Sequence, residues 1–365
     1  MNIKKYTGFF SVLHAVHESY PATYQFQIAF NNFVLNVFVN NALLAATLIH
    51  YFSEFIVLNP QQHVNSTVTV HDTPPLNFPY QYKTALPSAP HKLPKHEWID
   101  LPDGRIVRHK RTNMHYIIAD GYNCIAGSCV QYKNQVVNFI NSRFINRQVD
   151  SGYLLGHAAA VTLNGRGVII SGNSGAGKST LALHMLTSGA DFVSNDRVLM
   201  HPSGQNPFYG TLQQPRINPG TALNNPKLEQ ILSPQERMEF GKMRPESLWQ
   251  LEHKYDVLIP ECYDAHRFIP HAPLSGAVII DWCRNTEPMV IEEYAAQEAR
   301  PYLAHMMKKN DLLYLPKNKE YTDPVLSDYI QALHDKPVFV IRGGVNFAEA
   351  TKKLMNFLNT GHTSV

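Results

Sequence analysis

The stretch GVIISGNSGAGKSTLALHML, residues 167–186, decides the fold of the larger part of this chain. A short apolar run at 168–170 has the character of a buried strand, and a helix-competent run follows at 180–186. The residues between them, 172–179, fit the pattern G-x-x-x-x-G-K-[ST] completely. Glycines let the backbone turn tightly enough to direct several N–H groups at phosphate oxygens. The order of strand, loop and helix therefore predicts a phosphate-binding loop.

The loop residues have distinct predicted roles. The ammonium of Lys178 is expected to neutralise the β and γ phosphates of ATP, and the hydroxyl of Ser179 is expected to ligate Mg²⁺. A glycine-rich turn without a ligand is the alternative interpretation. The residues predicted to bind the nucleotide are Gly172, Asn173, Ser174, Gly175, Ala176, Gly177, Lys178, Ser179 and Thr180.

Two further side chains are candidates because of their distance from the loop in the sequence. Asp196 ends a short run at 192–196, where a strand beside the loop strand would present a carboxylate to the metal or to its water. His157 precedes the first strand of a predicted pair that doubles back at Asn164-Gly165, which would return it to the phosphate end of the sheet. A solvated turn carboxylate and a core histidine are the alternatives.

Two arginines are candidates for contacting phosphate. Arg216 lies in the turn-rich segment QQPRINPG, where a guanidinium would bind a phosphate bidentately, and a surface arginine is the alternative. Arg267, which precedes the apolar run GAVIIDW, is a second candidate for the cation that compensates transition-state charge.

The length of 365 residues favours two domains. Residues 1–97 are expected to form a smaller α+β region, with a hairpin at 26–39, a helix from 42, and a proline-rich linker at 59–97 in which both helix and central strand are discouraged. From 98 the chain is expected to form a kinase-like domain, entered through a β-rich segment and a helix at 132–147 and closed by an amphipathic helix at 347–359.

Composition excludes several classes of function. The 32 Lys and Arg against 29 Asp and Glu leave a net charge of +3, too small for a protein that wraps nucleic acid or coats an anionic membrane. The four cysteines are too few for a disulfide scaffold, so we expect a cytoplasmic protein. Neither a signal peptide nor a transmembrane helix is expected.

Gly156-His157-Ala158, the loop GNSGAGKST and the segment SNDRV at 194–198 occur together in an order and spacing that resemble the HPr kinase/phosphorylase family. These bacterial enzymes phosphorylate a serine of a small carrier protein. The segment PRINPGT at 215–221 and the later LWQLEHKYDV further resemble the subgroup called HPr-kinase-related kinase B. The resemblance covers residues 150–200 and continues more loosely through GAVIIDW.

The resemblance implies an α/β fold with a P-loop kinase domain of the HPr kinase and phosphoenolpyruvate carboxykinase type. It also implies ATP and Mg²⁺ as cofactors, a protein-serine acceptor, and active-site roles for His157 and Asp196. Together with the loop residues and the arginine of QQPRINPG, the predicted catalytic residues are His157, Lys178, Asp196 and Arg216, and the predicted metal ligands are Ser179 and Asp196. A functional link to an ATP-grasp enzyme is implied as well, and a homo-oligomer stays open.

This chain departs from the family pattern at three places. The family's Asp-Asp pair is Asn195-Asp196 here, an expected acidic metal ligand falls near the neutral Gln213-Gln214, and an expected arginine is Val257. We therefore keep three functional hypotheses: an ATP-dependent phosphotransferase acting on a protein hydroxyl, a nucleotide-gated binding module without transfer, and a small-molecule kinase.

Overall fold

The computed structural model describes residues 8–85, 93–205, 207–251, 253–318 and 320–362. The chain divides into two compact units, Met1–Asp150 with Asn310–Thr322, and Ser151–Lys309 with Asp323–Val365. Residues 1–7, on which much of the signal-peptide expectation rests, lie outside the described residues. No described helix is long and apolar enough to cross a membrane.

The first unit is built on an eight-stranded sheet in the order β1-β2-β3-β8-β7-β6-β5-β4. The predicted hairpin is present, because β1 and β2 pair antiparallel around a turn in which Asn31 has a φ of 55°. The predicted helix at 132–147 is also present as α3. The elements of this unit are α1 (Phe9–Ser19), β1 (Tyr24–Phe30), β2 (Phe33–Val39), α2 (Ala42–Tyr51), η1 (Ser53–Phe55), β3 (Ser66–Asp72), β4 (Lys83–Thr84), β5 (His96–Leu101), β6 (Gly104–His109), β7 (His115–Ile118), β8 (Tyr122–Gly127) and α3 (Lys133–Asp150).

Strand β3 corrects the expectation for the proline-rich segment. It lies between β2 and β8, runs parallel to both, and is therefore a central strand. Its own run STVTVHD contains no proline and is rich in β-branched residues. Threonine and valine alternate in it, and Val68 and Val70 are fully buried. Strands β5 to β8 extend the same sheet. The compact units accordingly divide after Asp150, whereas the sequence places the boundary at residue 97.

A segment from far along the chain completes the first unit. Residues Asn310–Thr322 return to it, and the buried guanidinium of Arg143 donates to the carbonyl oxygen of Leu313 at 2.7 Å. Arg105 donates to the carbonyl oxygens of Leu312 and Tyr314, both at 3.3 Å. These bonds satisfy backbone groups of a segment whose described residues, 310–318 and 320–322, form neither helix nor strand.

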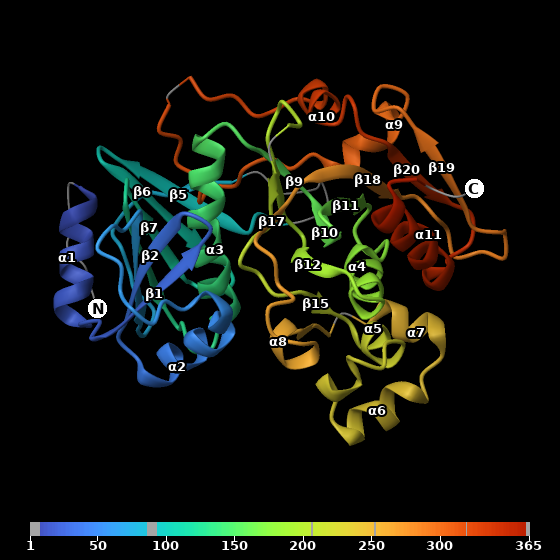
Figure 1. Cartoon of the computed structure of the whole chain (residues 1–365). Coiled ribbons are helices and arrows are strands. Elements are labelled where there is room, and N and C mark those ends of the chain that lie inside the picture. The colour runs from blue at the N-terminus through green and yellow to red at the C-terminus, as the bar shows by residue number, and fades with distance from the viewer. Residues whose placement is uncertain (1–7, 86–92, 206, 252, 319, 363–365) are drawn as a thin grey trace. The chain divides into compact units, whose positions relative to one another are not determined.

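The second unit contains a six-stranded sheet in the order β12-β10-β11-β18-β20-β19. Strands β11, β18 and β20 are parallel, and the others pair antiparallel. Helices α4 and α11 lie side by side on one face (Figure 1). The elements on the sheet and that face are β10 (Ala158–Leu163), β11 (Arg166–Gly172), α4 (Lys178–Thr187), β12 (Asp191–Ser194), β18 (Leu274–Ile280), β19 (Val290–Tyr294), β20 (Val338–Arg342) and α11 (Phe347–Thr360), which is the predicted closing helix.

Burial on both faces explains why the central strands are apolar throughout rather than alternating. In β11, Val168 and Ile170 pack toward α4 and α11, whereas Ile169 packs into the cluster on the opposite face. That second face is covered by a four-stranded sheet and short helices. They are β9 (Leu154–Gly156), β13 (Val198–Met200), β14 (Phe208–Tyr209), β17 (His271–Ala272), α9 (Arg300–Leu303), η3 (Ala304–Met306) and α10 (Leu326–Ala332).

A mostly helical segment between β14 and β17 completes the second unit. Its strands β15 and β16 form a two-stranded ladder. The elements are β15 (Arg216–Ile217), α5 (Pro219–Leu223), η2 (Glu229–Ile231), α6 (Pro234–Gly241), α7 (Pro245–Gln250), β16 (Tyr255–Asp256) and α8 (Ile259–Cys262). The whole is a mixed α/β fold with several sheets, in agreement with the predicted class.

Candidate functional site

The glycine-rich loop joins β11 to α4, as the sequence predicts. Two of its glycines are required by the backbone. Gly172 has a φ of 148°, and a Cβ there would lie 2.6 Å from the carbonyl oxygen of Ile280. Gly177 has a φ of 98°, and a Cβ there would lie 2.8 Å from the ring of Phe347. Any other residue at these positions would combine an unfavourable dihedral with a steric clash.

Lys178 is the first residue of α4, and its side chain folds back over the loop. Its Nζ donates to the carbonyl oxygens of Gly172 at 2.9 Å and of Asn173 at 3.0 Å. Burial lowers the pKa of Lys178, the negative charge of Asp196 opposes this, and the positive charges of Arg197 and Lys254 reinforce it. Burial is the largest of these effects, so an anion beside the ammonium would stabilise its charged form.

The hairpin of β10 and β11 sets the position of His157 relative to the loop. The turn residues Asn164 and Gly165 have φ angles of 51° and 74°, which match the twist of the strands. Ala158 pairs with Ser171, so His157 is level with the start of the loop. The hydroxyl of Ser171 donates to the carbonyl oxygen of His157 at 3.0 Å, which ties the two strand ends together.

Asp196 lies between two positively chargeable partners. Nε2 of His157 is 3.1 Å from Oδ1 of Asp196, and the guanidinium of Arg197 contacts Oδ2. Asp196 has a φ of 66°, a left-handed conformation that is uncommon for residues other than glycine and is enriched at functional sites. The hydroxyl of Ser179 donates to Oδ1 of Asn195 at 2.5 Å, which links the first turn of α4 to this turn.

The ionisation of Asp196 follows from these contacts. Burial alone would raise its pKa, but the hydrogen bond from His157 and the charges of Arg197, His157 and Lys308 outweigh burial. The pKa of Asp196 is therefore held well below its usual range. At neutral pH this group is an anion that can accept hydrogen bonds or ligate a cation.

The position of Asp196 in the sheet differs from the prediction in one respect. The sequence places its strand beside the loop strand, but β10 lies between β12 and β11. The tight hairpin makes β10 the neighbour of β11, so β12 is displaced to the sheet edge. Asp196 still reaches the site because it follows β12 in a turn that approaches α4 through Asn195 and Ser179.

The other predicted residues lie in different settings. The Nε of Arg216 is 3.2 Å from Oδ1 of Asp256 on the paired strand β16, so this guanidinium is already neutralised. Arg267 donates to the carboxylate of Asp191 and to the carbonyl oxygen of Ala190, which fixes the segment after α4. Its contacts are those of a structural residue, and its suggested role at the phosphate stays a prediction.

Two positions where the family pattern has a charged residue are neutral in this chain, and both have structural roles. Gln214 is buried and its Oε1 accepts from the backbone N–H of Ile259 at 3.1 Å. Val257 is fully buried, and its N–H donates to the carbonyl oxygen of Pro215. The hydroxyl of Thr180 shares a hydrogen bond of 2.9 Å with that of Thr221, which ties the start of α4 to the same segment.

The loop is supported by an aromatic bracket, which consists of Trp282, Phe347 and His184. This cluster was not predicted from the sequence. The indole N–H of Trp282 donates to the carbonyl oxygen of Ala176 at 2.9 Å. Phe347 meets the Trp282 ring edge to face at 4.8 Å and stacks on His184 at 5.4 Å. These residues come from three separate elements, so no local pattern could have linked them.

The donor set at the loop fits Mg²⁺. Ser179, Asn195 and Asp196 supply a hydroxyl, an amide oxygen and a carboxylate, the oxygen donors that this ion prefers. Within the described ranges, no cluster of three or more His, Cys, Asp or Glu side chains is arranged to hold a metal. The ion would therefore depend on phosphate oxygens and water for most of its ligands, as is common for Mg²⁺.

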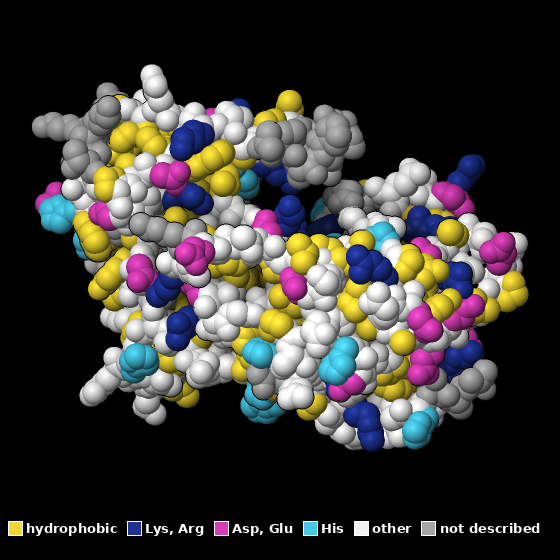
Figure 2. All heavy atoms as spheres, turned by 90° about the horizontal axis from the view of Figure 1, so that it is seen from above, with side chains coloured by type: hydrophobic (Ala, Val, Ile, Leu, Met, Phe, Trp, Pro, Cys, Tyr) yellow, Lys and Arg dark blue, Asp and Glu magenta, His cyan; other side chains and the backbone are white. Residues whose placement is uncertain are grey.

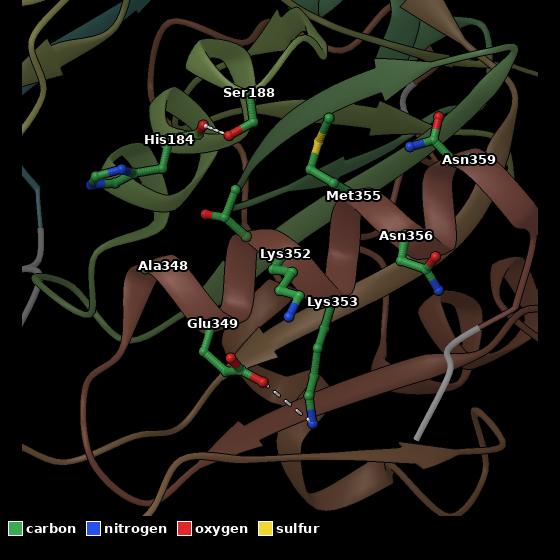
Figure 3. A pocket seen from close by; sticks show the side chains of 10 residues that line it. His184, Ser188, Ala348, Glu349, Lys352, Lys353, Met355, Asn356 and Asn359 are labelled. Carbon is green, nitrogen blue, oxygen red and sulfur yellow. Dashed lines mark hydrogen bonds and ion pairs between the residues drawn. The ribbon is translucent and has the colours of Figure 1, made fainter.

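A groove of about 780 Å³ lies elsewhere on this unit (Figure 3). It is formed by His184 of α4, by Ser188 directly after that helix, and by α11, where Glu349 and Lys353 form an ion pair of 4.0 Å. Its lining shares only His184 with the aromatic bracket.

On the face drawn in Figure 2, basic and acidic side chains are interspersed, which does not favour a nucleic-acid surface.

Comparison with known proteins identifies one part of the chain. Residues 152–218 match the model of the HPr Serine kinase C-terminal domain. The Hpr(Ser) kinase/phosphatase from Coxiella burnetii shares 12% identity over 57% of this chain and 95% of that one, with a TM-score of 0.27. No curated protein matches the chain. The resemblance to the HPr-kinase-related family is therefore confirmed, and residues 152–218 are the segment that relates this chain to it.

Proposed function

We propose that this chain is an ATP-dependent phosphotransferase that transfers the γ-phosphate to a hydroxyl group of a protein acceptor. The observation that carries the proposal is the convergence of Lys178 and Ser179, from the loop and α4, with Asp196 and His157, from two other segments. The match of residues 152–218 to a kinase domain supports the same reaction class.

In this proposal the loop N–H groups and Lys178 bind the triphosphate, which requires Lys178 to exchange its two carbonyl partners for phosphate oxygens. Ser179 and Asp196 would hold Mg²⁺, which supplies charge neutralisation at the β and γ phosphates. His157 and the ionised Asp196 would orient the acceptor hydroxyl and accept its proton. Phosphoryl transfer through a loose transition state needs positioning and charge compensation more than a strong base.

The direct test is phosphate transfer. Purified chain with [γ-³²P]ATP, Mg²⁺ and lysate of its own host is expected to label a protein, and the Lys178→Ala variant is expected to abolish that label. Absence of label with the unaltered chain across a range of acceptor fractions would count against the proposal.

A second candidate is a nucleotide-gated binding module that transfers nothing. It is favoured by the full engagement of Asp196 with His157 and Arg197, and by the neutral Asn195 beside it. If ATP raises the unfolding temperature but neither ADP nor a phosphoprotein forms over hours, this second function replaces the first. ADP release that depends on a small molecule, without protein labelling, would instead identify a small-molecule kinase.

A further inference from the structure

Arg197, which follows Asp196 directly, and the two arginines predicted to contact phosphate, Arg216 and Arg267, have different partners in the structure. Arg216 is paired with Asp256 within the β15–β16 ladder. Arg267 is paired with Asp191 and also donates to a backbone carbonyl. Arg197 is the one of the three whose carboxylate partner, Asp196, belongs to the proposed site.

The backbone around Arg197 holds its side chain near that carboxylate. The N–H of Arg197 donates to the carbonyl oxygen of Asn195 at 2.8 Å, and its carbonyl oxygen accepts from the hydroxyl of Ser194. That hydroxyl also accepts from the N–H of Thr211 at 3.1 Å. The turn is therefore anchored on both sides, and a movement of Arg197 would involve its side chain rather than its backbone.

The side chain of Arg197 is 24% exposed, and its guanidinium donates to both the carbonyl and the carboxylate oxygen of Asp196. The carboxylate of Asp196 thus neutralises Arg197 through Oδ2, while His157 contacts Oδ1 of the same carboxylate. The ammonium of Lys178 is also nearby. A polyphosphate would supply the missing negative charge. It would also offer a guanidinium two oxygens in the geometry that it binds best.

We propose that Arg197 recognises the terminal phosphate of the nucleotide, and that Asp196 holds its guanidinium when no nucleotide is bound. Binding of a triphosphate transfers Arg197 from the carboxylate to the phosphate and leaves an oxygen of Asp196 open to a cation. This inference rests on the proposed function and specifies how the site distinguishes a triphosphate from a diphosphate.

The test compares the affinities of the full chain for ADP and for the non-hydrolysable analogue AMP-PNP, by calorimetric titration with Mg²⁺ present. The unaltered chain is expected to bind AMP-PNP more tightly than ADP. Arg197→Gln is expected to reduce that preference at least about tenfold, because it removes a charged hydrogen bond made only to the third phosphate. Arg197→Lys keeps the positive charge but loses the bidentate geometry of the guanidinium. It is expected to retain part of the preference for AMP-PNP that Arg197→Gln loses.

A matched control and a competing variant sharpen the result. The control, Arg237→Gln, removes an arginine whose ion pair with Glu229 is long, at 3.9 Å, and is expected to keep the preference for AMP-PNP. Arg216→Gln tests the other arginine predicted to contact phosphate. A preference that survives Arg197→Gln, or that is lost in Arg216→Gln instead, would overturn the assignment of Arg197.

The outcomes separate this inference from the proposed function. If the unaltered chain binds neither nucleotide, both fail. If it binds both nucleotides and transfers phosphate, but its preference is insensitive to residue 197, only the present inference fails. Should Arg197→Gln not fold, Arg197→Lys decides the question, since an unchanged preference in that variant would show that the bidentate fork is not used.

Discussion

Lys178 is the residue whose replacement tests the loop most directly. Its ammonium is held by two backbone carbonyl oxygens, which water can solvate when the side chain is removed. Lys178→Ala is therefore expected to leave the fold intact and to weaken ATP binding at least about tenfold, since a charged contact to phosphate is lost. Calorimetric titration measures this effect, and Lys352→Ala, in the groove of Figure 3, is the matched control. Equal affinities in the two variants would contradict a phosphate-binding loop.

Asp196 and Asn195 are adjacent but have different partners, so their variants are expected to differ. Asp196→Asn keeps the shape of the side chain and removes the charge that would hold a cation. It is expected to lose the Mg²⁺ dependence of ATP binding. Asn195→Ala removes the acceptor of the Ser179 hydroxyl and is expected to have a smaller effect on that dependence. Titrations with and without Mg²⁺ separate them, and similar mild effects in both would place this turn outside the site.

The depressed pKa of Asp196 adds a condition to that experiment. Because the folded protein holds this carboxyl ionised well below its usual range, protonation of Asp196 should not affect Mg²⁺ dependence between pH 5 and pH 8. The Asp196→Asn comparison is therefore valid at any pH in that window.

At the scale of elements, the loop conformation depends on the aromatic bracket. Trp282, which follows β18, donates to the carbonyl oxygen of Ala176, and Phe347 at the start of α11 fills the space that a side chain at Gly177 would need. The loop is thus fixed by two elements outside the motif, which preorganises its N–H groups before any ligand binds.

Replacement of Trp282 by Phe tests this support. The ring is largely kept but the hydrogen bond to Ala176 is lost, so nucleotide affinity is expected to fall about two- to tenfold. Trp249→Phe is the matched control, because Trp249 stacks instead on Arg284 at 4.2 Å. Binding of AMP-PNP, followed by calorimetry, should be weakened by the first change only. Equal affinities would show that the loop does not need the bracket.

For the whole molecule, two buried histidines in the first unit predict a dependence of stability on pH. Burial lowers the pKa of His71 to about 4 and that of His115 to about 3, from an ordinary value of 6.5. Below pH 6.5 the unfolded chain therefore binds protons that the folded chain does not. Stability falls as the pH is lowered from 6.5 toward 4, by up to about 1.4 kcal/mol per pH unit for each histidine.

The variant His115→Phe isolates one of the two contributions. His115 is fully buried and packs against Phe78 with ring centroids 4.9 Å apart, so an apolar ring suits the position. Urea unfolding between pH 6.5 and pH 5 is expected to show a shallower slope of stability against pH in this variant. His63→Gln, at an exposed position, is expected to keep the original slope. An unchanged slope in His115→Phe would mean that this histidine is protonated in the folded state.

The sequence by itself determined the features that depend on neighbouring residues. The strand, loop and helix around Lys178, the turn at Asn164 and Gly165, and the closing helix α11 follow from glycine dihedrals and from apolar periodicity. The mixed α/β class and the relation to the HPr-kinase-related family were likewise predictable, because they rest on a compact motif. The roles assigned to His157, Asp196 and Arg216 stay predictions.

Only the tertiary structure decided which distant segments meet. It placed β3 at the centre of a sheet although prolines surround it, because parallel pairing with β2 and β8 depends on residues far along the chain. It also brought His157 to Asp196 and paired Arg216 with Asp256. The sequence does not show which opposite charge an ionised side chain will pair with, because the pairing depends on the distance between the side chains in the folded protein.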